Sequence, residues 1–230
     1  MNQPKVIAVV GTTASGKTDL AIELAKKFNG ELVSVDSRQI YKEMNIGTNK
    51  DYRYPHHLMD LVTPDQVLTL ADIQKLAFET IEDIIQRGKV PILVGGTGLY
   101  ITAILENWKI PDEKGDPKYD ALYIAPVIDR EEVYEKINRR VDQMLEEGWL
   151  DEIKDLGEKY GWNTVAMTGH GYKQLGAYLR GETTLEKAIE ETKKVIRHYA
   201  KRQLTWWRHH GDVNWVDGIG EAKKLVNIFL

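Results

Sequence analysis

The chain has 230 residues, a net charge of −4 and no cysteine. Disulfide bonds, thiolate metal sites and cysteine nucleophiles are therefore excluded, and the length suits one α/β domain with a small helical addition. No apolar stretch is long enough for a membrane helix and the N-terminus lacks the pattern of a secretory signal, so we expect a cytoplasmic protein. The acidic balance argues mildly against a nucleic-acid partner, unless a local basic surface overrides it.

The first half of the chain alternates between strand and helix patterns. Short apolar runs predict buried strands at residues 6–10, 32–35 and 90–94. Helical patterns separate them, from Lys17 to Phe28 and from Leu70 to Gly88. This rhythm predicts an α/β fold of the P-loop NTPase type, with a parallel sheet, right-handed crossovers and flanking helices.

The second half is mostly helical. Two weaker strands are predicted at residues 122–128, where Pro126 favours a bulge or a sheet edge, and at 213–216. Residues 111–120 are polar and turn-rich, which indicates a surface connection. One helix is predicted at 131–147, and a second helix runs from there to about Tyr160. A long helix is expected to reach about Arg208, opened by Thr183 and Glu186, which have capping-box spacing.

The strongest motif is "GTTASGKT", which fits the glycine-rich phosphate loop G-x-x-x-x-G-K-[ST]. A predicted strand precedes it and a predicted helix follows it, as the motif requires. Its backbone N–H groups favour an anion, Lys17 adds a positive charge, and the Thr18 hydroxyl can ligate Mg²⁺. The loop therefore predicts a phosphate-chain site made of Gly11, Thr12, Thr13, Ala14, Ser15, Gly16, Lys17 and Thr18.

Two further segments follow predicted strands. Asp36 comes after the second strand, and "GGTG" at residues 95–98 comes after the third. Because ligands gather at the carboxyl ends of parallel strands, both should face the same crevice as Lys17. Asp36 could ligate a metal, accept a proton or only cap a turn. The glycines could admit a ligand beside the Thr97 hydroxyl, or form a plain tight turn.

The pair His56 and His57 suggests a metal site at first sight. Adjacent residues do not face one direction, however, and no third ligand is evident nearby. Packing and loop hydrogen bonds are therefore favoured over metal binding.

The segment from Glu190 to His210 is basic although the protein is acidic. Six lysines and arginines stand there against two glutamates, and Trp206 and Trp207 follow. Such a helix could hold a phosphate backbone and an unstacked base, or it could be a solvated face with core tryptophans. The cations are Lys193, Lys194, Arg197, Lys201, Arg202 and Arg208, of which Arg197, Lys201 and Arg208 lie near one helix face.

Several of these segments together resemble the tRNA dimethylallyltransferases, also called isopentenyl transferases. The matching segments occur in the order of that family: "GTTASGKT", "VDSRQIYKEMNIGT", "PHHLMD", "LVGGTGLY", "GYKQL" and "YAKRQLTW". The resemblance extends over about residues 6–110 and 129–217. Their order and spacing distinguish the chain from a generic nucleotide kinase.

The family transfers a five-carbon prenyl group from dimethylallyl diphosphate to N6 of adenosine 37 in certain tRNAs. The resemblance implies that the loop holds the donor diphosphate with Mg²⁺, and that Asp36 is the general base. Thr97 matches a threonine at the donor and reaction centre, and Arg197 suits a cation at the leaving diphosphate. Ser37, Arg38 and Gln39 match the segment that contacts the target base and its neighbours, and Lys201 and Arg202 belong to the expected RNA-binding helix.

The implied organisation is a phosphate-loop core at residues 1–128 and 211–230, and a helical part at 129–210 that contributes to RNA binding. The expected partners are dimethylallyl diphosphate and a tRNA anticodon stem-loop, with no membrane partner. We expect the protein to be a monomer.

One departure from the family concerns an insertion. Family members usually carry several dozen helical residues after the "GGTGLY" helix, which help to grip the anticodon stem-loop, whereas here only "PDEKGDPKYD" stands in that place. The short adenylate-type isopentenyltransferases, which prenylate free AMP, ADP or ATP, also lack a large insertion. They stay an alternative, as do a P-loop kinase of a small metabolite and a non-enzymatic RNA-binding module.

Overall fold

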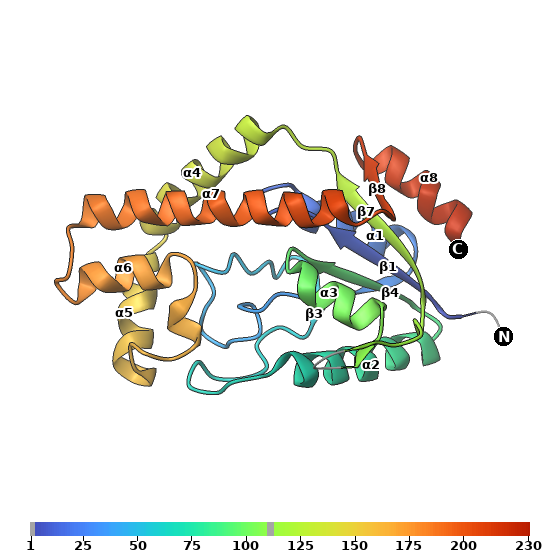
Figure 1. The fold of residues 1–230 in the computed structure, drawn as a ribbon, viewed down its shortest axis with the longest axis horizontal. Helices are drawn as coiled ribbons and strands as arrows, with labels where there is room; N and C mark the ends of the chain where they lie inside the picture. The colour runs from blue at the N-terminus through green and yellow to red at the C-terminus, as the bar shows by residue number, and fades with distance from the viewer. Residues whose placement is uncertain (1–2, 110–112) are drawn as a thin grey trace.

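The computed structural model describes residues 3–109 and 113–230. Six parallel strands form one sheet in the order β3-β2-β4-β1-β7-β8. The predicted α/β fold is confirmed, and the core of the sheet is seen on the right of Figure 1. The strands are β1 (Lys5–Val10), β2 (Gly30–Ser34), β3 (His56–His57), β4 (Val90–Gly95), β7 (Asp120–Pro126) and β8 (Val213–Val216).

Helices cover both faces of the sheet because its strands are apolar on both sides. In β1, Val6, Ala8 and Val10 join one core cluster, while Ile7 and Val9 join the other. Helices α2 (Leu70–Gln86) and α3 (Gly98–Leu105) pack on the first face. Helices α1 (Lys17–Lys27) and α8 (Ile219–Phe229) pack on the second. A strand buried on both faces reads as a continuous apolar run, which is why "VIAVV" predicted β1.

The helical part has a core of its own, in which Trp149 and Tyr172 are almost fully buried. It consists of α4 (Arg130–Glu146), α5 (Trp149–Tyr160), a 3₁₀ turn at Ala166–Thr168, α6 (Tyr172–Leu179) and α7 (Leu185–His209). Helix α7 runs from the helical part, on the left of Figure 1, to the sheet, where its Trp207 enters the core.

Two local predictions were wrong. The cap of α7 is Thr184, whose side chain accepts a hydrogen bond from the Lys187 amide, one residue later than the predicted cap at Thr183. Strand β7 lies inside the sheet between β1 and β8, whereas Pro126 had suggested an edge or a bulge. The proline is tolerated because β1 pairs with β7 only as far as Val9 and Ile124. Towards β8, which does pair at Pro126, the next amide, that of Val127, donates to the Val216 carbonyl at 2.9 Å.

Several short elements were not predicted. Helices α6 and α8 and strand β3 are among them, together with a hairpin of β5 (Trp108–Lys109) and β6 (Glu113–Lys114). The hairpin replaces part of the expected surface connection, of which Pro111 and Asp112 lie outside the described residues. Within the described ranges, no helix is both long and apolar enough to span a membrane.

Candidate active site

The phosphate loop joins β1 to α1 at the carboxyl edge of the sheet. Gly16 is the N-cap of α1 and supplies no side-chain cap, so the first-turn amides are left for an anion. Lys17 donates to the Thr12 carbonyl at 3.0 Å. Burial lowers the pKa of Lys17 to about 8, against the opposing effect of the Asp36 carboxylate, and Arg140 lowers it further. The loop thus holds a lysine whose charge a bound anion would stabilise.

Gln203 of α7 connects the phosphate loop with the loop after β4. Its Oε1 accepts the Thr13 amide at 2.8 Å. Its Nε2 lies so close to Gly96 that a Cβ there would approach it to 2.1 Å. A side chain at Gly96 would therefore displace Gln203, through which α7 supports both loops.

Asp36 lies two residues beyond the end of β2. Its Oδ1 accepts the backbone amides of Arg38 at 2.8 Å and Gln39 at 3.3 Å, so it does cap a turn. The other oxygen, Oδ2, accepts no hydrogen bond from a residue that the structure describes. The carboxylate lies in the wall of the central cavity together with Lys17. This position is compatible with accepting a proton and with ligating a metal.

An aromatic pair lines the cavity opposite the strands. The rings of His170 and Tyr199 stack with centroids 4.7 Å apart and planes 25° apart. Burial raises the pKa of Tyr199 and the nearby Asp36 carboxylate raises it further, whereas the polar side chains of Thr97 and Gln203 lower it. Tyr199 therefore joins Asp36 and Thr97 in one neighbourhood.

The central cavity encloses about 330 Å³. The phosphate loop, the segment after Asp36, the end of β4, α4 and α7 form its walls. Arg140 of α4 lines it as a second cation, and burial lowers the pKa of this guanidinium. Arg197 is not among the described residues that line it, and its Nη1 donates to Asn138 Oδ1 at 2.6 Å. The role of Arg197 at the leaving group stays a prediction.

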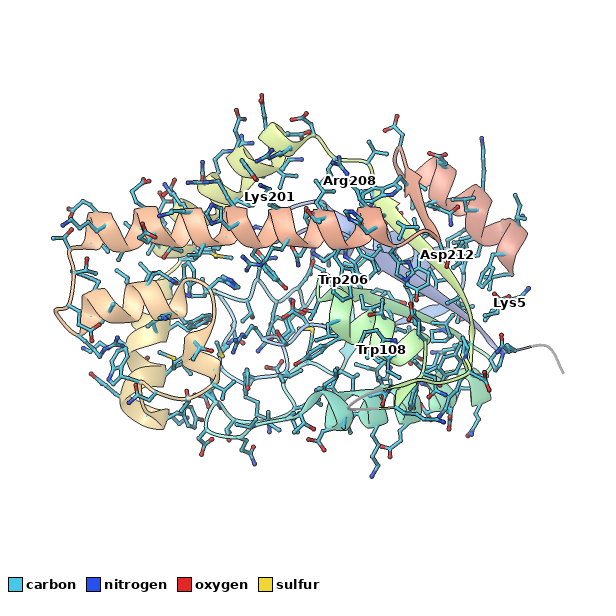
Figure 2. The ribbon with its side chains drawn as sticks, viewed as in Figure 1. Lys5, Trp108, Lys201, Trp206, Arg208 and Asp212 are labelled. Atoms are coloured by element: carbon cyan, nitrogen blue, oxygen red, sulfur yellow. The ribbon has the colours of Figure 1, made fainter. Side chains whose placement is uncertain are left out.

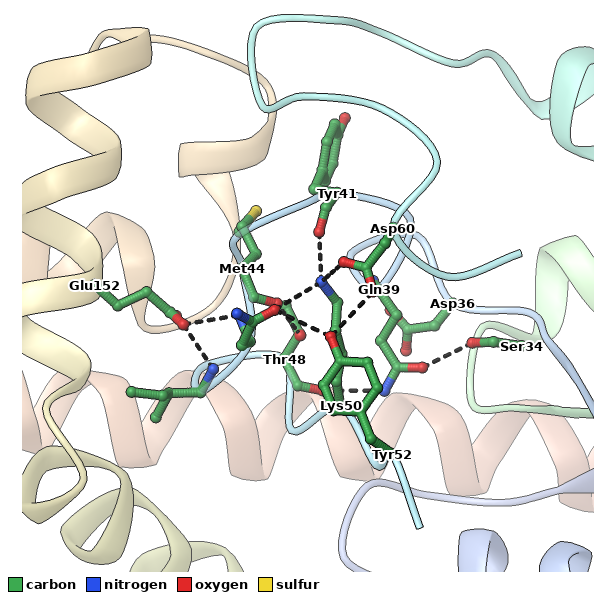
Figure 3. A network of polar contacts seen from close by, with 12 residues as sticks. Ser34, Asp36, Gln39, Tyr41, Met44, Thr48, Lys50, Tyr52, Asp60 and Glu152 are labelled. Atoms are coloured by element: carbon green, nitrogen blue, oxygen red, sulfur yellow. Dashed lines mark hydrogen bonds and ion pairs between the residues drawn. The ribbon is translucent and has the colours of Figure 1, made fainter. Parts of the chain in front are cut away.

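The loop after Asp36 is fixed by a polar network (Figure 3). The Lys50 side chain is fully buried, and its Nζ donates to the Tyr41 carbonyl and to Asp60 Oδ1, each at 2.6 Å. Glu152 of α5 accepts the amides of Asn45 and Ile46, each at 2.7 Å. The helical part thereby anchors the loop that forms one wall of the cavity.

Ser37, Arg38 and Gln39 all line this cavity, but two of their side chains already bind within the protein. Arg38 Nη1 donates to the Val165 carbonyl at 2.6 Å. Gln39 Oε1 accepts the Ser34 hydroxyl at 2.7 Å. The contact of these three residues with RNA stays a prediction.

The exposed part of α7 carries the predicted basic surface. Lys201, Arg202 and Trp206 are exposed, whereas Trp207 is buried in the core of the sheet. Trp207 is therefore a core tryptophan, whereas Trp206 is accessible at the surface, and the binding of RNA by this helix stays a prediction. Figure 2 shows Lys201 and Arg208 on one side of α7 and Trp206 on the other.

His56 and His57 bind within the protein, as the favoured interpretation predicted. His56 Nδ1 lies 2.7 Å from the Tyr54 carbonyl, and His57 Nε2 lies 2.7 Å from Glu31. In the part of the chain that the structure describes, no group of three or more His, Cys, Asp or Glu side chains could hold a metal ion. Thr18 lines the cavity at the start of α1, where a metal bound with a phosphate chain would need a hydroxyl.

Comparison with known proteins identifies the family. The model of the family described as IPP transferase matches residues 39–121 and 110–210. The chain is 36% identical to a tRNA dimethylallyltransferase of Acetivibrio thermocellus, over 96% of this chain and 95% of the relative. The chain belongs to the IPP transferase family.

Solved structures agree with this assignment. The crystal structure of a full-length tRNA isopentenylpyrophosphate transferase from Bacillus halodurans is similar with a TM-score of 0.91 and 34% identity, over 99% of this chain and 95% of that one. A eukaryotic dimethylallyltransferase acting on tRNA is similar with a TM-score of 0.83 and 28% identity, over 93% and 74% of the two chains. The P-loop fold and the family of prenyl-transferring enzymes are therefore shared.

This IPP transferase is shorter than such relatives. The alignment with the Acetivibrio thermocellus protein runs over 296 residues, whereas this chain has 230, so the relative contains segments that this chain lacks. The two stretches matched by the family model meet at residues 110–121. This agrees with the predicted loss of an insertion at that point.

Sequence reasoning missed three side chains of the site. Gln203 lies within the quoted "YAKRQLTW" segment, so that segment could have suggested it. Tyr199 opens the same segment, so that segment could have suggested it too. Arg140 occupies an ordinary amphipathic helix pattern and carries no local signal.

Proposed function

We propose that this enzyme transfers the dimethylallyl group from dimethylallyl diphosphate to N6 of adenosine 37 in tRNA and releases diphosphate. The observation that carries the proposal is the cavity that Lys17 and Asp36 both line, one on the phosphate loop and the other beyond β2. A diphosphate on the loop and an acceptor beside Asp36 would therefore meet in one enclosed space. Membership of the family and the similarity to tRNA-modifying relatives support the choice of substrates.

The phosphate loop is the proposed donor site. The α1 amides, Lys17 and Arg140 present positive charge to the diphosphate, which gains charge as the carbon–oxygen bond breaks. The Thr18 hydroxyl would hold Mg²⁺ together with diphosphate oxygens, and the ion would neutralise part of that charge. Because the described residues offer no cluster that holds a metal alone, metal and diphosphate should bind together.

Asp36 is the proposed base. The adenine N6 amine is a poor nucleophile, because its lone pair is delocalised into the ring. As the N6–carbon bond forms, the amine proton passes to the carboxylate, and diphosphate leaves with the electrons of the broken carbon–oxygen bond. The hydrogen bonds of the Arg38 and Gln39 amides to Oδ1 hold the carboxylate in place and leave Oδ2 for the proton.

The acceptor adenine must leave its stack to enter the enclosed cavity. We assign its contacts to Ser37, Arg38 and Gln39 on one wall, and to Thr97 at the reaction centre. Tyr199, next to both Asp36 and Thr97, supplies a flat wall for the base.

Radiolabelled dimethylallyl diphosphate offered with total tRNA or with AMP tests the proposal. We expect label in tRNA and none in AMP. Label in AMP alone would establish the adenylate-type activity instead. Turnover of ATP with a small acceptor, without prenyl transfer, would favour a kinase.

A further inference from the structure

A second groove lies next to the central cavity, between α7, α3 and the β5–β6 hairpin. It measures about 780 Å³ and shares no lining residue with the central cavity. From α7 it receives Lys201, Arg202, His198, His209 and Trp206, and from β5 it receives Trp108. Figure 2 shows Trp206 on the side of α7 that faces Trp108.

Trp206 is both exposed and fixed in place. Its side chain is 39% accessible to solvent. It packs so closely on Gly98 that a Cβ there would lie 2.3 Å from Trp206 Cδ1. Trp108 is fixed too, since its Nε1 donates to Glu106 Oε2 at 2.9 Å. A fixed, exposed indole with cations beside it is a surface on which a nucleobase stacks while phosphates are held nearby.

We propose that this groove binds the nucleotides that adjoin the target adenosine in the same RNA strand. One of their bases stacks on Trp206, and Lys201 and Arg202 hold the adjacent phosphates. The inference rests on the proposed function and extends it, because it gives the acceptor strand a second site outside the catalytic cavity.

The groove adjoins the reaction centre. Gly98, which contacts Trp206, directly follows Thr97 in the chain. Arg202 lies at the border of the two spaces, where its Cζ is 5.7 Å from the centre of the Tyr199 ring and its Nη2 is 3.5 Å from His170 Nε2. A strand whose adenine enters the central cavity therefore continues over Arg202 into the groove.

The charge of the groove suits a polyanion. Lys201 and Arg202 line it against one carboxylate, that of Glu106, on a protein of net charge −4, so the basic surface is local. A free adenine nucleotide would occupy only the central cavity and would leave the groove unused. The groove therefore favours a polynucleotide acceptor over a free nucleotide. In addition, the family model breaks at residues 110–121, beside Trp108, so this chain meets the RNA here without the longer segment of its relatives.

The test compares Trp206→Ala with Trp206→Phe, which keeps an aromatic face. Fluorescence anisotropy with a labelled anticodon stem-loop should show binding weakened roughly 5- to 100-fold in Trp206→Ala and largely retained in Trp206→Phe. Calorimetric affinity for dimethylallyl diphosphate should not change in either variant. Wild-type stem-loop affinity in Trp206→Ala, or an equal loss of donor affinity, would overturn the inference.

A charge variant gives a second readout. Lys201→Ala combined with Arg202→Ala should lower the slope of log affinity against log salt by about 0.7 for each phosphate that the variant no longer neutralises. Lys224→Ala is the matched control and should leave the slope unchanged, because Lys224 is exposed on α8, which packs on the opposite face of the sheet from α3. An unchanged slope in the double variant would count against the groove.

The inference and the proposed function fail in different ways. If wild-type protein binds the stem-loop through Trp206 but transfers no prenyl group to it, the groove stands and the proposed reaction falls. If wild-type protein prenylates the stem-loop and Trp206→Ala does so with the same KM, the reaction stands and the groove falls.

Discussion

At the scale of single residues, Lys17 and Asp36 are the two groups proposed to act on the donor diphosphate and on the acceptor amine. Lys17 and Asp36 follow different strands and meet at the cavity. Burial lowers the pKa of Lys17, and the Asp36 carboxylate raises it. In the proposed reaction their requirements are opposite, since the lysine must stay charged beside diphosphate while the carboxylate must take up a proton.

Replacing Asp36 with asparagine should slow transfer without unfolding the site. The amide oxygen can still accept the hydrogen bonds of the Arg38 and Gln39 amides, but it cannot serve as the base. Single-turnover rates should fall roughly 10²- to 10⁴-fold. Affinities for donor and stem-loop, measured by calorimetry, should stay within about twofold of wild type. Near-normal turnover in this variant would remove Asp36 from that role.

Donor affinity should depend on pH through Lys17. A diphosphate favours the charged lysine, so binding is strong below the pKa of about 8 and weakens as pH rises through it. The loss should approach about tenfold per pH unit until the pKa of the bound state is reached. Calorimetric titrations across this range test it. Lys17→Met should bind weakly at every pH and lack the bend near 8; a bend of the same size in both proteins would assign it to another group.

Between elements, side chains from the helical part hold the loops of the sheet. Gln203 binds the phosphate loop at Thr13, and Glu152 binds the loop after Asp36. The catalytic loops are therefore positioned by helices that follow them by more than 100 residues in the chain.

Removing the Glu152 carboxylate should loosen the loop that lines the cavity. It accepts three backbone amides and the Tyr172 hydroxyl. Glu152→Ala should destabilise the protein by about 1.5–3 kcal/mol, because charged hydrogen bonds are removed from a half-buried place. Urea unfolding measures this. As a control, Asp155→Ala removes an exposed carboxylate from the same helix and should change stability by less than about 0.5 kcal/mol. Equal losses of stability in the two variants would show that Glu152 does not anchor the loop.

A methyl group at Gly96 should displace Gln203. The approach of 2.1 Å involves the end of a flexible side chain, so the helix can remain in place while the bond to the Thr13 amide is broken. We expect kcat to fall about tenfold or more, since both catalytic loops lose a shared support. Thermal melting should show a smaller effect. Gly220→Ala, where a Cβ meets nothing within 4 Å, is the control.

How far the sequence predicts this site depends on whether its parts are contiguous. The phosphate loop and Asp36 were predictable, because a strand end and a fixed spacing define them within one stretch of backbone. Arg140 was not, because it reaches the cavity only through the packing of α4 against α7. Pro126 misled for a similar reason, since the end of β1 makes its missing N–H harmless and this depends on the register of a distant strand.

On the scale of the whole molecule, we expect the short chain to retain its transfer activity and to bind its RNA substrate more weakly than full-length relatives do. The walls of the central cavity are present, and we infer from the overlap of the two family-model matches that the segments missing from this chain belong near residues 110–121. Contacts remote from the reacting atoms position the substrate and contribute mainly to binding. We therefore expect KM for an anticodon stem-loop about tenfold or more above that of a full-length relative, with a smaller change in kcat.

Steady-state kinetics with this enzyme and the Bacillus halodurans protein on the same stem-loop would check this. Equal KM values for the two enzymes would show that the contacts present in the short chain are enough to bind the stem-loop. A stem-loop that is inert here, while free nucleotides are prenylated, would instead support the adenylate-type activity.

Helix α7 has one more consequence. It is a single helix of 25 residues, and it carries both Tyr199 at the catalytic cavity and Trp206 in the groove. These residues are seven positions apart in the chain, which is two helical turns and a rise of about 10 Å. Because the helix is continuous, this spacing cannot adjust to the substrate. If RNA occupies both sites as proposed, the acceptor strand must adopt the spacing of the helix, and a bulged or stiffly stacked strand would bind poorly whatever its sequence.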